Sequence, residues 1–387
     1  MRYTLMNRSY ETAEVTIKRK GKGEYDFFID EILDKDRLPF AVQYAPDHKM
    51  TAELARWFRQ RSIPDYRVGI TRLQQAVGED LFYRSLTSRA QSLTDRFWLR
   101  KKGSHETWDQ VSYAINGWSY DTGNFILGAT KIVSNKTSPD YTVNGRLGKV
   151  WRKQGDNTFL LKLGAGRFRT EPYSEAAVSE ILRKTFHLPF VSYRVDIINH
   201  QPCSICKNFT DDNLEFITAG EICRSAPRQE GIPIDLHLRE QCHRLGIPGY
   251  NHFLDELHRL DYITGNQDRN LGNYGFMRNV NTLEFIGPAP IFDNGAAIFG
   301  QDEIVNNFEI NTIDHLSDQI SDIAAIQHLP EFNFNSIVKD VCKDSDIPES
   351  MQEQAAESMA KRMEDVEKRI REAQRRYTRQ KNDILEH

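Results

Sequence analysis

The sequence predicts an α+β protein in which a strand-rich lobe precedes a helical lobe, with an accessory α+β domain before them and a helix at the end. Three observations support this prediction. The chain has 387 residues, which is enough for more than one domain. Strand-like runs at 159–163, 191–198 and 203–207 surround a single predicted helix at 171–184. Beyond these strands the apolar spacing becomes helical, most clearly at 251–264.

We divide the chain into four parts. The accessory domain spans residues 1–130, the strand-rich lobe 131–209, the helical lobe 210–345, and a C-terminal amphipathic helix 346–387. The first boundary lies in the polar stretch 134–140, which contains a proline and shows no periodicity.

The accessory domain begins with a predicted β-hairpin. Two strand-like runs, 14–17 and 25–29, flank a turn that contains two glycines. Helices are expected at 50–60 and 68–77, separated by Pro64, which cannot continue a helix. Aromatic residues then gather, and we expect them to form core: Phe97, Trp98, Trp108, Tyr113, Trp118 and Tyr120.

Composition and charge narrow the classes of protein. The 51 Lys and Arg nearly balance the 55 Asp and Glu, so no basic excess indicates direct nucleic-acid binding or an anionic membrane. No apolar run approaches the roughly 18 residues that a membrane span needs. The first residues lack the apolar core of a signal peptide. We therefore expect a cytoplasmic protein without a membrane partner.

The five cysteines indicate reduced thiols rather than a disulfide framework, because their number is odd and their spacing irregular. Cys203 and Cys206 form a Cys-x-x-Cys pair, which raises the alternative of a zinc site. The second pair that such a site needs is missing. We therefore favour a packed strand at these positions.

The C-terminal helix is predicted from apolar residues that recur every three or four positions after Ser350 among many charges. One interpretation is a helix docked on the helical lobe, and the other is a coiled-coil dimer. Docking is favoured because alanine and methionine make a weak coiled-coil seam.

The segment that carries chemistry begins at Asp268, with Asn273 five residues later and Asp293 in an Asp-Asn-Gly sequence. Phosphoryl transfer needs a carboxylate to orient or deprotonate the acceptor hydroxyl, and oxygen ligands for magnesium. Asp268 can serve as the first, and Asn273 and Asp293 as the others. The spacing of five equals that of the protein-kinase catalytic loop.

A cation for the nucleotide phosphates is also expected, held by a carboxylate on a nearby helix. Lys162 ends an apolar strand, where an unpaired ammonium would be costly. Glu175 is a candidate partner on the next helix. Glu180 lies on the same helix, and spacing does not exclude it.

Upstream, residues 144–150 can form a turn over the phosphates. The backbone at Gly145 and the side chain of Lys149 would be donors to those phosphates. An ordinary hairpin turn is the alternative interpretation.

Together, the runs 266–275, 292–295, 161–162 and 171–175 resemble HipA-like serine/threonine kinases, a branch that also resembles phosphatidylinositol kinases. The resemblance covers about residues 140–330 and is strongest for standalone bacterial forms with their own N-terminal domain. It implies a bilobal protein-kinase-like fold and ATP with Mg²⁺ as cofactors.

The resemblance also assigns roles to residues. It implies that Asp268 is the catalytic acid/base, and that Asn273 and Asp293 ligate the metal. Lys162 and Glu175 would anchor the phosphates, with Glu175 favoured over Glu180 by this comparison. The backbone at two further positions would bind adenine: Lys207 and Phe209. One departure is Asn270, because relatives usually have a titratable histidine there.

Two further properties follow from the resemblance. Relatives autophosphorylate near the phosphate loop, which makes Ser138 the main candidate here, before Thr137 and Thr142. A phosphate so close to the ATP phosphates should lower activity. Relatives also act as toxins on translation factors and pair with DNA-binding antitoxins, and this chain encodes no antitoxin.

The sequence therefore predicts a serine/threonine protein kinase that acts on a protein substrate. Two other hypotheses stay open. The acceptor could be a lipid or a small molecule on the same fold. Alternatively, the chain could be a nucleotide-binding interaction module without catalysis, as Asn270 suggests.

Overall fold

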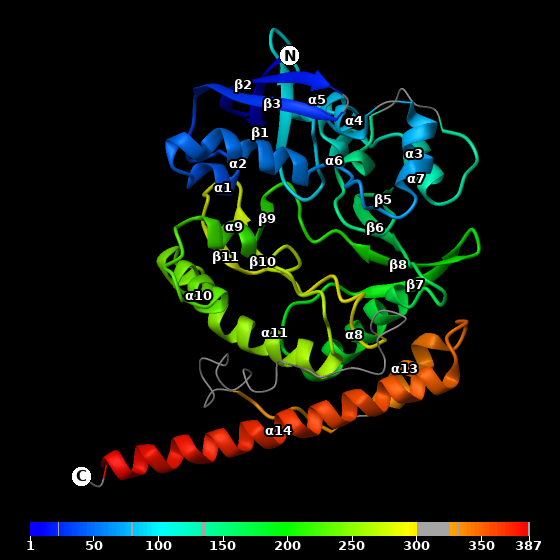
Figure 1. Cartoon of the computed structure of the whole chain (residues 1–387), viewed down its shortest axis with the longest axis vertical. Helices are drawn as coiled ribbons and strands as arrows, with labels where there is room; N and C mark the ends of the chain where they lie inside the picture. Colours follow the sequence, from blue (N-terminus) through cyan, green and yellow to red (C-terminus); the bar gives the residue numbers. More distant parts are fainter. Residues whose placement is uncertain (22, 79, 133–136, 300–325, 332, 386–387) are drawn as a thin grey trace.

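Three antiparallel sheets and the helices around them form the structure (Figure 1). The computed structural model describes residues 1–385 except 22, 79, 133–136, 300–325 and 332, with only the backbone at 380–385. The predicted mixture of helices and antiparallel strands is confirmed. The four domain boundaries and the two-lobed kinase arrangement stay predictions.

The first sheet belongs to the N-terminal part and has the order β3-β2-β1-β4. Its strands are β1 (Arg2–Asn7), β2 (Tyr10–Gly21), β3 (Glu24–Ile32) and β4 (Phe97–Lys101). The predicted hairpin is confirmed, with Ile17 of β2 opposite Phe27 of β3. Because side chains alternate along a strand, Phe27 points into the core and stacks on Phe58, whereas Phe28 is exposed.

The N-terminal part also contains seven helices among the described residues. They are α1 (Phe40–Gln43), α2 (Asp47–Gln60), α3 (Ile70–Val77), α4 (Leu81–Thr87), α5 (Trp108–Val111), α6 (Tyr113–Asn116) and α7 (Asp121–Ile126). The predicted break between α2 and α3 is confirmed. Of the aromatic group expected in the core, Trp118 and Tyr120 are only partly buried, and the other four are buried. Phe40 of α1 packs into the core of the C-terminal helices.

The second sheet has the order β5-β6-β8-β7 and carries the predicted strands. Its strands are β5 (Lys149–Gln154), β6 (Asn157–Leu163), β7 (Tyr193–Ile198) and β8 (Gln201–Lys207). Helix α8 (Glu171–Thr185) contacts β6, β7 and β8, and a proline in its first turn suits a helix start. Cys203 and Cys206 are buried in β8 and pack into two different apolar clusters, as a packed strand requires.

The segment 137–142 differs from the irregular polar stretch expected there. Residues Pro139–Thr142 form a short 3-10 helix, η1, and all four are buried. The Asp140 carboxylate accepts hydrogen bonds from the backbone N–H of Trp151 (2.7 Å) and from the Ser138 hydroxyl (3.0 Å). These bonds tie η1 to β5, which is why so polar a stretch lies inside the protein.

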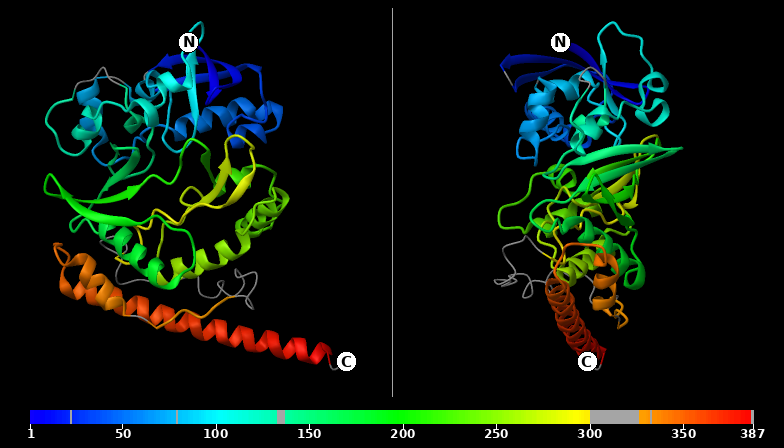
Figure 2. Two further views of the ribbon diagram at one scale, coloured as in Figure 1. Left: turned by 180° about the vertical axis from the view of Figure 1, so that it is seen from behind. Right: turned by 90° about the vertical axis from the view of Figure 1, so that its right-hand side faces the viewer.

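The third sheet, β11-β10-β9, lies among the C-terminal helices. Its strands are β9 (Leu214–Thr218), β10 (Gly275–Asn279) and β11 (Phe285–Pro288). The helices are α9 (Ala219–Arg224), α10 (Ile234–Arg244), α11 (Tyr250–Thr264), α13 (Phe334–Cys342) and α14 (Glu349–Leu385). Figure 2 shows the first sheet at the end of the molecule that carries the N-terminus, and α14 at the opposite end.

Helix α14 docks on the helical part, as the favoured interpretation predicted. Its apolar residues Met359, Val366 and Ile370 are buried in the same core as α11 and α13. The Tyr262 hydroxyl of α11 donates to Asp365 (3.0 Å). The C-terminal end of α14 projects beyond the rest of the molecule (Figures 1 and 2). Within the described residues, no helix is long and apolar enough to cross a membrane.

Candidate active site

A cleft of about 1190 Å³ lies between the second sheet, the loops after α11 and β11, and the N-terminal part. Its lining includes the candidate residues Gly145, Lys149, Lys207, Phe209, Asp268, Asn273 and Asp293. Segments far apart in the sequence therefore meet at one cavity. Its volume is slightly above the roughly 300–1,000 Å³ of ordinary small-molecule pockets, so a nucleotide-sized ligand would fit with room to spare.

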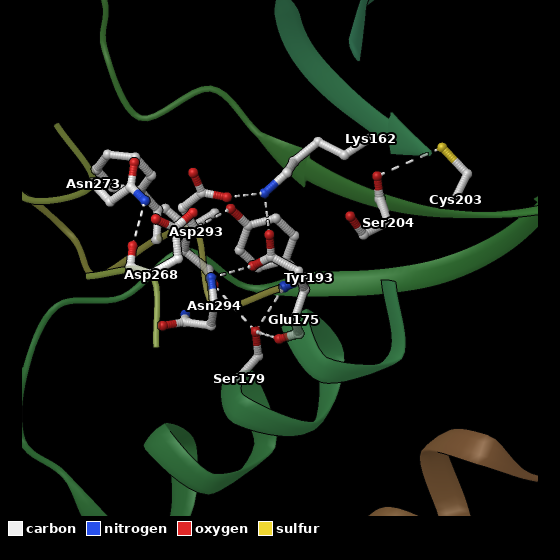
Figure 3. Close-up of polar contacts among 12 residues, drawn as sticks. Lys162, Glu175, Ser179, Tyr193, Cys203, Ser204, Asp268, Asn273, Asp293 and Asn294 are labelled. Carbon is white, nitrogen blue, oxygen red and sulfur yellow. Dashed lines mark hydrogen bonds and ion pairs between the residues drawn. The ribbon is translucent and has the colours of Figure 1, made fainter. Parts of the chain in front are cut away.

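The side chain of Lys162 is the centre of a buried charge cluster (Figure 3). Its ammonium forms ion pairs with Glu175 and Asp293. Lys162 is 3% exposed and Glu175 is 1% exposed. Glu180, the alternative partner, instead pairs with Arg183 at the surface.

Local folding explains this pairing. Leu161 points into an apolar cluster on one face of β6, so the next residue, Lys162, points to the other face, towards α8. Glu175 lies just over one turn into α8 and meets it there. Two carboxylates around one ammonium offset the cost of burying these charges.

The pKa values of the three charged groups in the cluster depend on one another. Burial alone would lower the pKa of Lys162, but Asp293 and Glu175 outweigh it and hold that pKa above its ordinary value. Burial raises the pKa of Glu175, against the effect of Lys162. For Asp293, burial would raise the pKa, but Lys162 and Lys149 hold it well below its ordinary value. Asp293 is therefore an anion at neutral pH.

The backbone around Asp293 is unusual. Asp293 has φ 58°, a left-handed backbone conformation that residues other than glycine rarely adopt. The next amide, Asn294 N–H, donates to the second carboxylate oxygen of Glu175 (3.0 Å). Glu175 thus fixes both the cation and the loop that carries Asp293.

The loop 266–273 presents Asp268 on its exposed side. Asn273 Nδ2 donates to the Asp268 carbonyl (2.7 Å), which leaves the Asn273 amide oxygen as its metal-binding atom. Asn270 Nδ2 donates to the Asp268 carboxylate (2.9 Å). Where relatives have histidine, this chain therefore places an uncharged donor on the candidate base.

Arg269 joins the two loops, a role that the sequence analysis missed. Its guanidinium donates to the carbonyls of Phe292 (2.7 Å) and Asn273 (3.1 Å), and also to the Asn294 side chain. Asp261 at the end of α11 pairs with it (2.9 Å). Its position between Asp268 and Asn273 was a signal in the sequence, but the sequence does not reveal which groups its guanidinium contacts.

At the other side of the cleft, Gly145 has φ 110°, and a Cβ there would lie 2.6 Å from Lys149 Nζ. The Lys149 side chain therefore passes close to Gly145, and the positive φ of this residue is what favours glycine here. Lys149 is half-buried at the start of β5, directly opposite Lys162 of β6. Burial lowers the pKa of Lys149, although Asp293 opposes this effect.

Three aromatic rings form one wall near the end of β8. Phe209 lies 5.6 Å from Phe216 and 5.4 Å from Phe292 between ring centroids, and all three line the cleft. Lys207 ends β8 and pairs with Phe159 of β6. The wall can stack on a planar base. Phe216 and Phe292 were not among the candidates, because their contact exists only after folding.

The candidate phosphorylation residues lie apart from the open part of the cleft, except Thr142, which lines it. Ser138 is fully buried, and the hydroxyl of the buried Thr142 donates to the Gln91 carbonyl (2.8 Å). Thr137 is half-buried. A phosphate on Ser138 or Thr142 would require η1 to leave its place.

Comparisons with known proteins identify related sequences and structures. No protein-family model matches the chain. The chain is 28% identical over 145 residues to the serine/threonine-protein kinase CtkA of Helicobacter pylori strain J99. That match covers 35% of this chain and 40% of CtkA, so it spans less than half of that relative's length.

Two solved structures are also similar. The Helicobacter pylori proinflammatory kinase CtkA has a TM-score of 0.42 at 15% identity, covering 58% of this chain and 94% of that one. HipA of Shewanella oneidensis MR-1, solved with HipB and operator DNA of its toxin–antitoxin system, has a TM-score of 0.49 at 12% identity. It covers 96% of this chain and 91% of that one. The sequence match to a serine/threonine kinase bears out the resemblance stated from the motifs: the chain is similar to HipA-like serine/threonine kinases.

Proposed function

We propose that the chain is an ATP- and Mg²⁺-dependent phosphotransferase, a serine/threonine protein kinase of the HipA type with a two-lobed kinase fold. The observation that carries this proposal is the ammonium of Lys162 held between Glu175 and Asp293. It lies beside the cleft that also receives Asp268. The partial sequence match to a serine/threonine kinase supports it.

The donor set of the cleft fits Mg-ATP. Mg²⁺ prefers oxygen ligands, and the Asp293 carboxylate and the Asn273 amide oxygen would hold it. An ammonium has three donors. Two of those on Lys162 go to carboxylates, so the third would bind phosphate, together with Lys149. When bound, Mg-ATP supplies the phosphoryl group, with its charge neutralised by the metal.

The acceptor side of the proposal rests on Asp268. Its carboxylate is exposed, so the hydroxyl of a protein serine or threonine can reach it. Asp268 would orient that hydroxyl and accept its proton. The Asn270 amide holds one carboxylate oxygen (2.9 Å) and leaves the other for the acceptor.

Asn270 also favours a second candidate function, a nucleotide-binding module without catalysis. Asparagine cannot titrate near neutral pH as the histidine of relatives does. Such a module would bind Mg-ATP through Lys162 and Asp293 but transfer nothing.

Incubation with γ-labelled ATP and Mg²⁺ tests these functions. We expect label on serine or threonine of the protein itself or of lysate proteins, and none with the Asp268→Asn variant. Label that enters only lipids or small molecules would select the alternative acceptor. Thermal stabilisation by Mg-ATP without any transfer would select the binding module. The absence of both Mg-ATP binding and phosphoryl transfer would contradict the proposal.

Autophosphorylation and a toxin-like role are the finer parts of this proposal. We propose Ser138, then Thr137 and Thr142, as acceptors whose phosphate, with about −1.5 to −2 charges, lowers activity. Peptide mapping after ATP treatment should find phosphate between residues 137 and 142. A toxin that acts in the cytoplasm and is neutralised by a separate antitoxin should arrest growth when expressed, unless Asp268 is replaced by asparagine.

A further inference from the structure

The N-terminal part of the chain grips the loop 143–146 through Arg67, in the segment between α2 and α3. Arg67 Nε donates to the Gly145 carbonyl (2.9 Å), and Nη2 donates to the Val143 carbonyl. The next residue, Val68, donates its backbone N–H to the Arg146 carbonyl (2.8 Å). Three carbonyls of the loop are therefore held from one side.

These carbonyls are the main partners of a buried cation. Arg67 is 4% exposed, and burial lowers its pKa to about 10, with Asp140 partly opposing. Among the described residues no ion pair of Arg67 is found, and its Nη1 is buried without a hydrogen-bond partner. The buried guanidinium is thus stabilised by the carbonyls of the loop, and the same hydrogen bonds hold the loop in its position.

Peptide geometry determines what this grip does to the loop. In a trans peptide the carbonyl and the following N–H point in opposite directions. Arg67 holds the carbonyls of Val143 and Gly145, so the N–H groups of Asn144 and Arg146 point away from it. Both residues line the cleft. Gly145, at φ 110°, allows this conformation while Lys149 crosses it.

We propose that Arg67 is a positioning residue that holds loop 143–146 with its amides directed at the nucleotide phosphates, so that the N-terminal part sets nucleotide affinity. The inference rests on the proposed function, because it takes the ligand of the cleft to be Mg-ATP. Without the hydrogen bonds from Arg67, the loop conformation that can bind nucleotide becomes a minor one. The apparent affinity then falls by the fraction that remains competent.

Hydrogen–deuterium exchange and nucleotide binding test the proposal on the full chain. The variants are Arg67→Met, Arg67→Lys and a matched control, Arg37→Met. Arg37 also reaches from the N-terminal part to two carbonyls, those of Val280 (2.8 Å) and Asn281 (3.1 Å), but away from the cleft. Without nucleotide, Arg67→Met should speed exchange of amides 144–147, and Arg37→Met should not.

With Mg-ATP, Arg67→Met should weaken binding about tenfold, as a competent fraction near a tenth implies. The KM for ATP should rise similarly with kcat nearly unchanged, and Arg67→Lys, which can still donate to a carbonyl, should recover part of both losses. Unchanged exchange in Arg67→Met, or faster exchange with parental affinity, would overturn the proposal. If the parent itself binds no Mg-ATP, the proposed function fails, and so does the link to affinity.

Discussion

The buried charge cluster around Lys162 and the loop 266–273 lie at the same cleft but are held in different ways. Lys162 and Glu175 are buried in β6 and α8, and each is the charge that the other requires. Asp268 lies exposed on a loop, and its carboxylate contacts only a neutral amide of Asn270 among the hydrogen bonds of the described residues. The first site is built into the core, whereas the second is presented to solvent.

At the buried cluster the same residues should serve both stability and nucleotide binding, whereas at the exposed loop the two can be separated. Removing Lys162 would leave two buried carboxylates without a counter-charge, so the fold and nucleotide binding should fail together. Removing the exposed carboxylate should cost chemistry alone. Variants on the two sides of the cleft can therefore show whether these dependencies separate as the geometry implies.

The largest effect is expected from Asp268→Asn, which should lower the transfer rate by about 10²–10⁴-fold, the range for a general acid–base group. Affinity for Mg-ATP should stay near that of the parent. Asp293→Asn should lose transfer and also bind Mg-ATP more weakly, because it removes a charged metal ligand. Initial rates and calorimetric titration measure both quantities. Equal loss of nucleotide binding in the two variants would contradict these roles.

The next effect concerns stability. Glu175→Gln leaves Lys162 paired with Asp293 alone. Because the ammonium keeps one opposite charge, the expected loss is about 1.5–3 kcal/mol, the range for a hydrogen bond to a charged group. Urea unfolding of the parent and the variant measures the loss. Glu180→Gln is the matched control, since Glu180 lies on the same helix in a surface pair, where a change of less than about 1 kcal/mol is expected. Similar losses in both variants would show that burial of Glu175 is not what matters.

Part of this site could be predicted from the sequence. A lysine at the end of an apolar strand demands a partner, so Lys162 was recognisable, and α8 offered two candidates. Spacing could not decide between Glu175 and Glu180, because both lie on one helix whose rotation against β6 is set by packing. The strands β6, β7 and β8, the hairpin of β2 and β3, and helix α14 followed from periodicity, which depends on local pattern.

Other features could not be predicted, for a common physical reason. Arg67 meets Gly145 across 78 positions of sequence, and Arg269 meets Phe292 across 23. No local pattern marks a donor whose acceptors are backbone carbonyls. The polar stretch 134–140 was expected to be an irregular boundary between domains, yet its Asp140 is buried because its partner is the backbone of Trp151.

Asp140 yields a pH-dependent prediction at the edge of the cleft. Burial raises its pKa to about 6 from an ordinary 3.8, so between these values the folded protein holds a proton that the unfolded chain has lost. Stability should therefore fall as pH rises from about 4 to about 6, by about 3 kcal/mol at most at about 1.4 kcal/mol per pKa unit.

Asparagine at this position can accept from the Trp151 N–H through its oxygen and donate to the Ser138 hydroxyl through its nitrogen, but it cannot titrate. Urea unfolding of the parent and Asp140→Asn at several pH values should show the parent losing stability relative to the variant across that window, with parallel curves above it. Parallel curves from pH 4 to 7 would mean that Asp140 is not the titrating group.

The smallest effect tests whether the two sides of the cleft are coupled. Arg269 touches both, through the backbone of Asn273 in the loop 266–273 and of Phe292 beside Asp293. Lysine keeps the charge but lacks the planar fork that serves these carbonyls and Asp261 at once. Arg269→Lys should therefore misalign the loops and lower kcat about tenfold, which corresponds to about 1.4 kcal/mol.

A matched arginine separates this effect from general destabilisation. Arg239 also spans several acceptors, Asp235 (2.9 Å), Asp255 (2.8 Å) and Asn251 (3.0 Å), but within α10 and α11 away from the cleft. Arg239→Lys should lower the melting temperature about as much as Arg269→Lys while leaving kcat near the parental value. If both variants lose rate in proportion to stability, the fork of Arg269 holds the fold only, and the buried and exposed sides act independently.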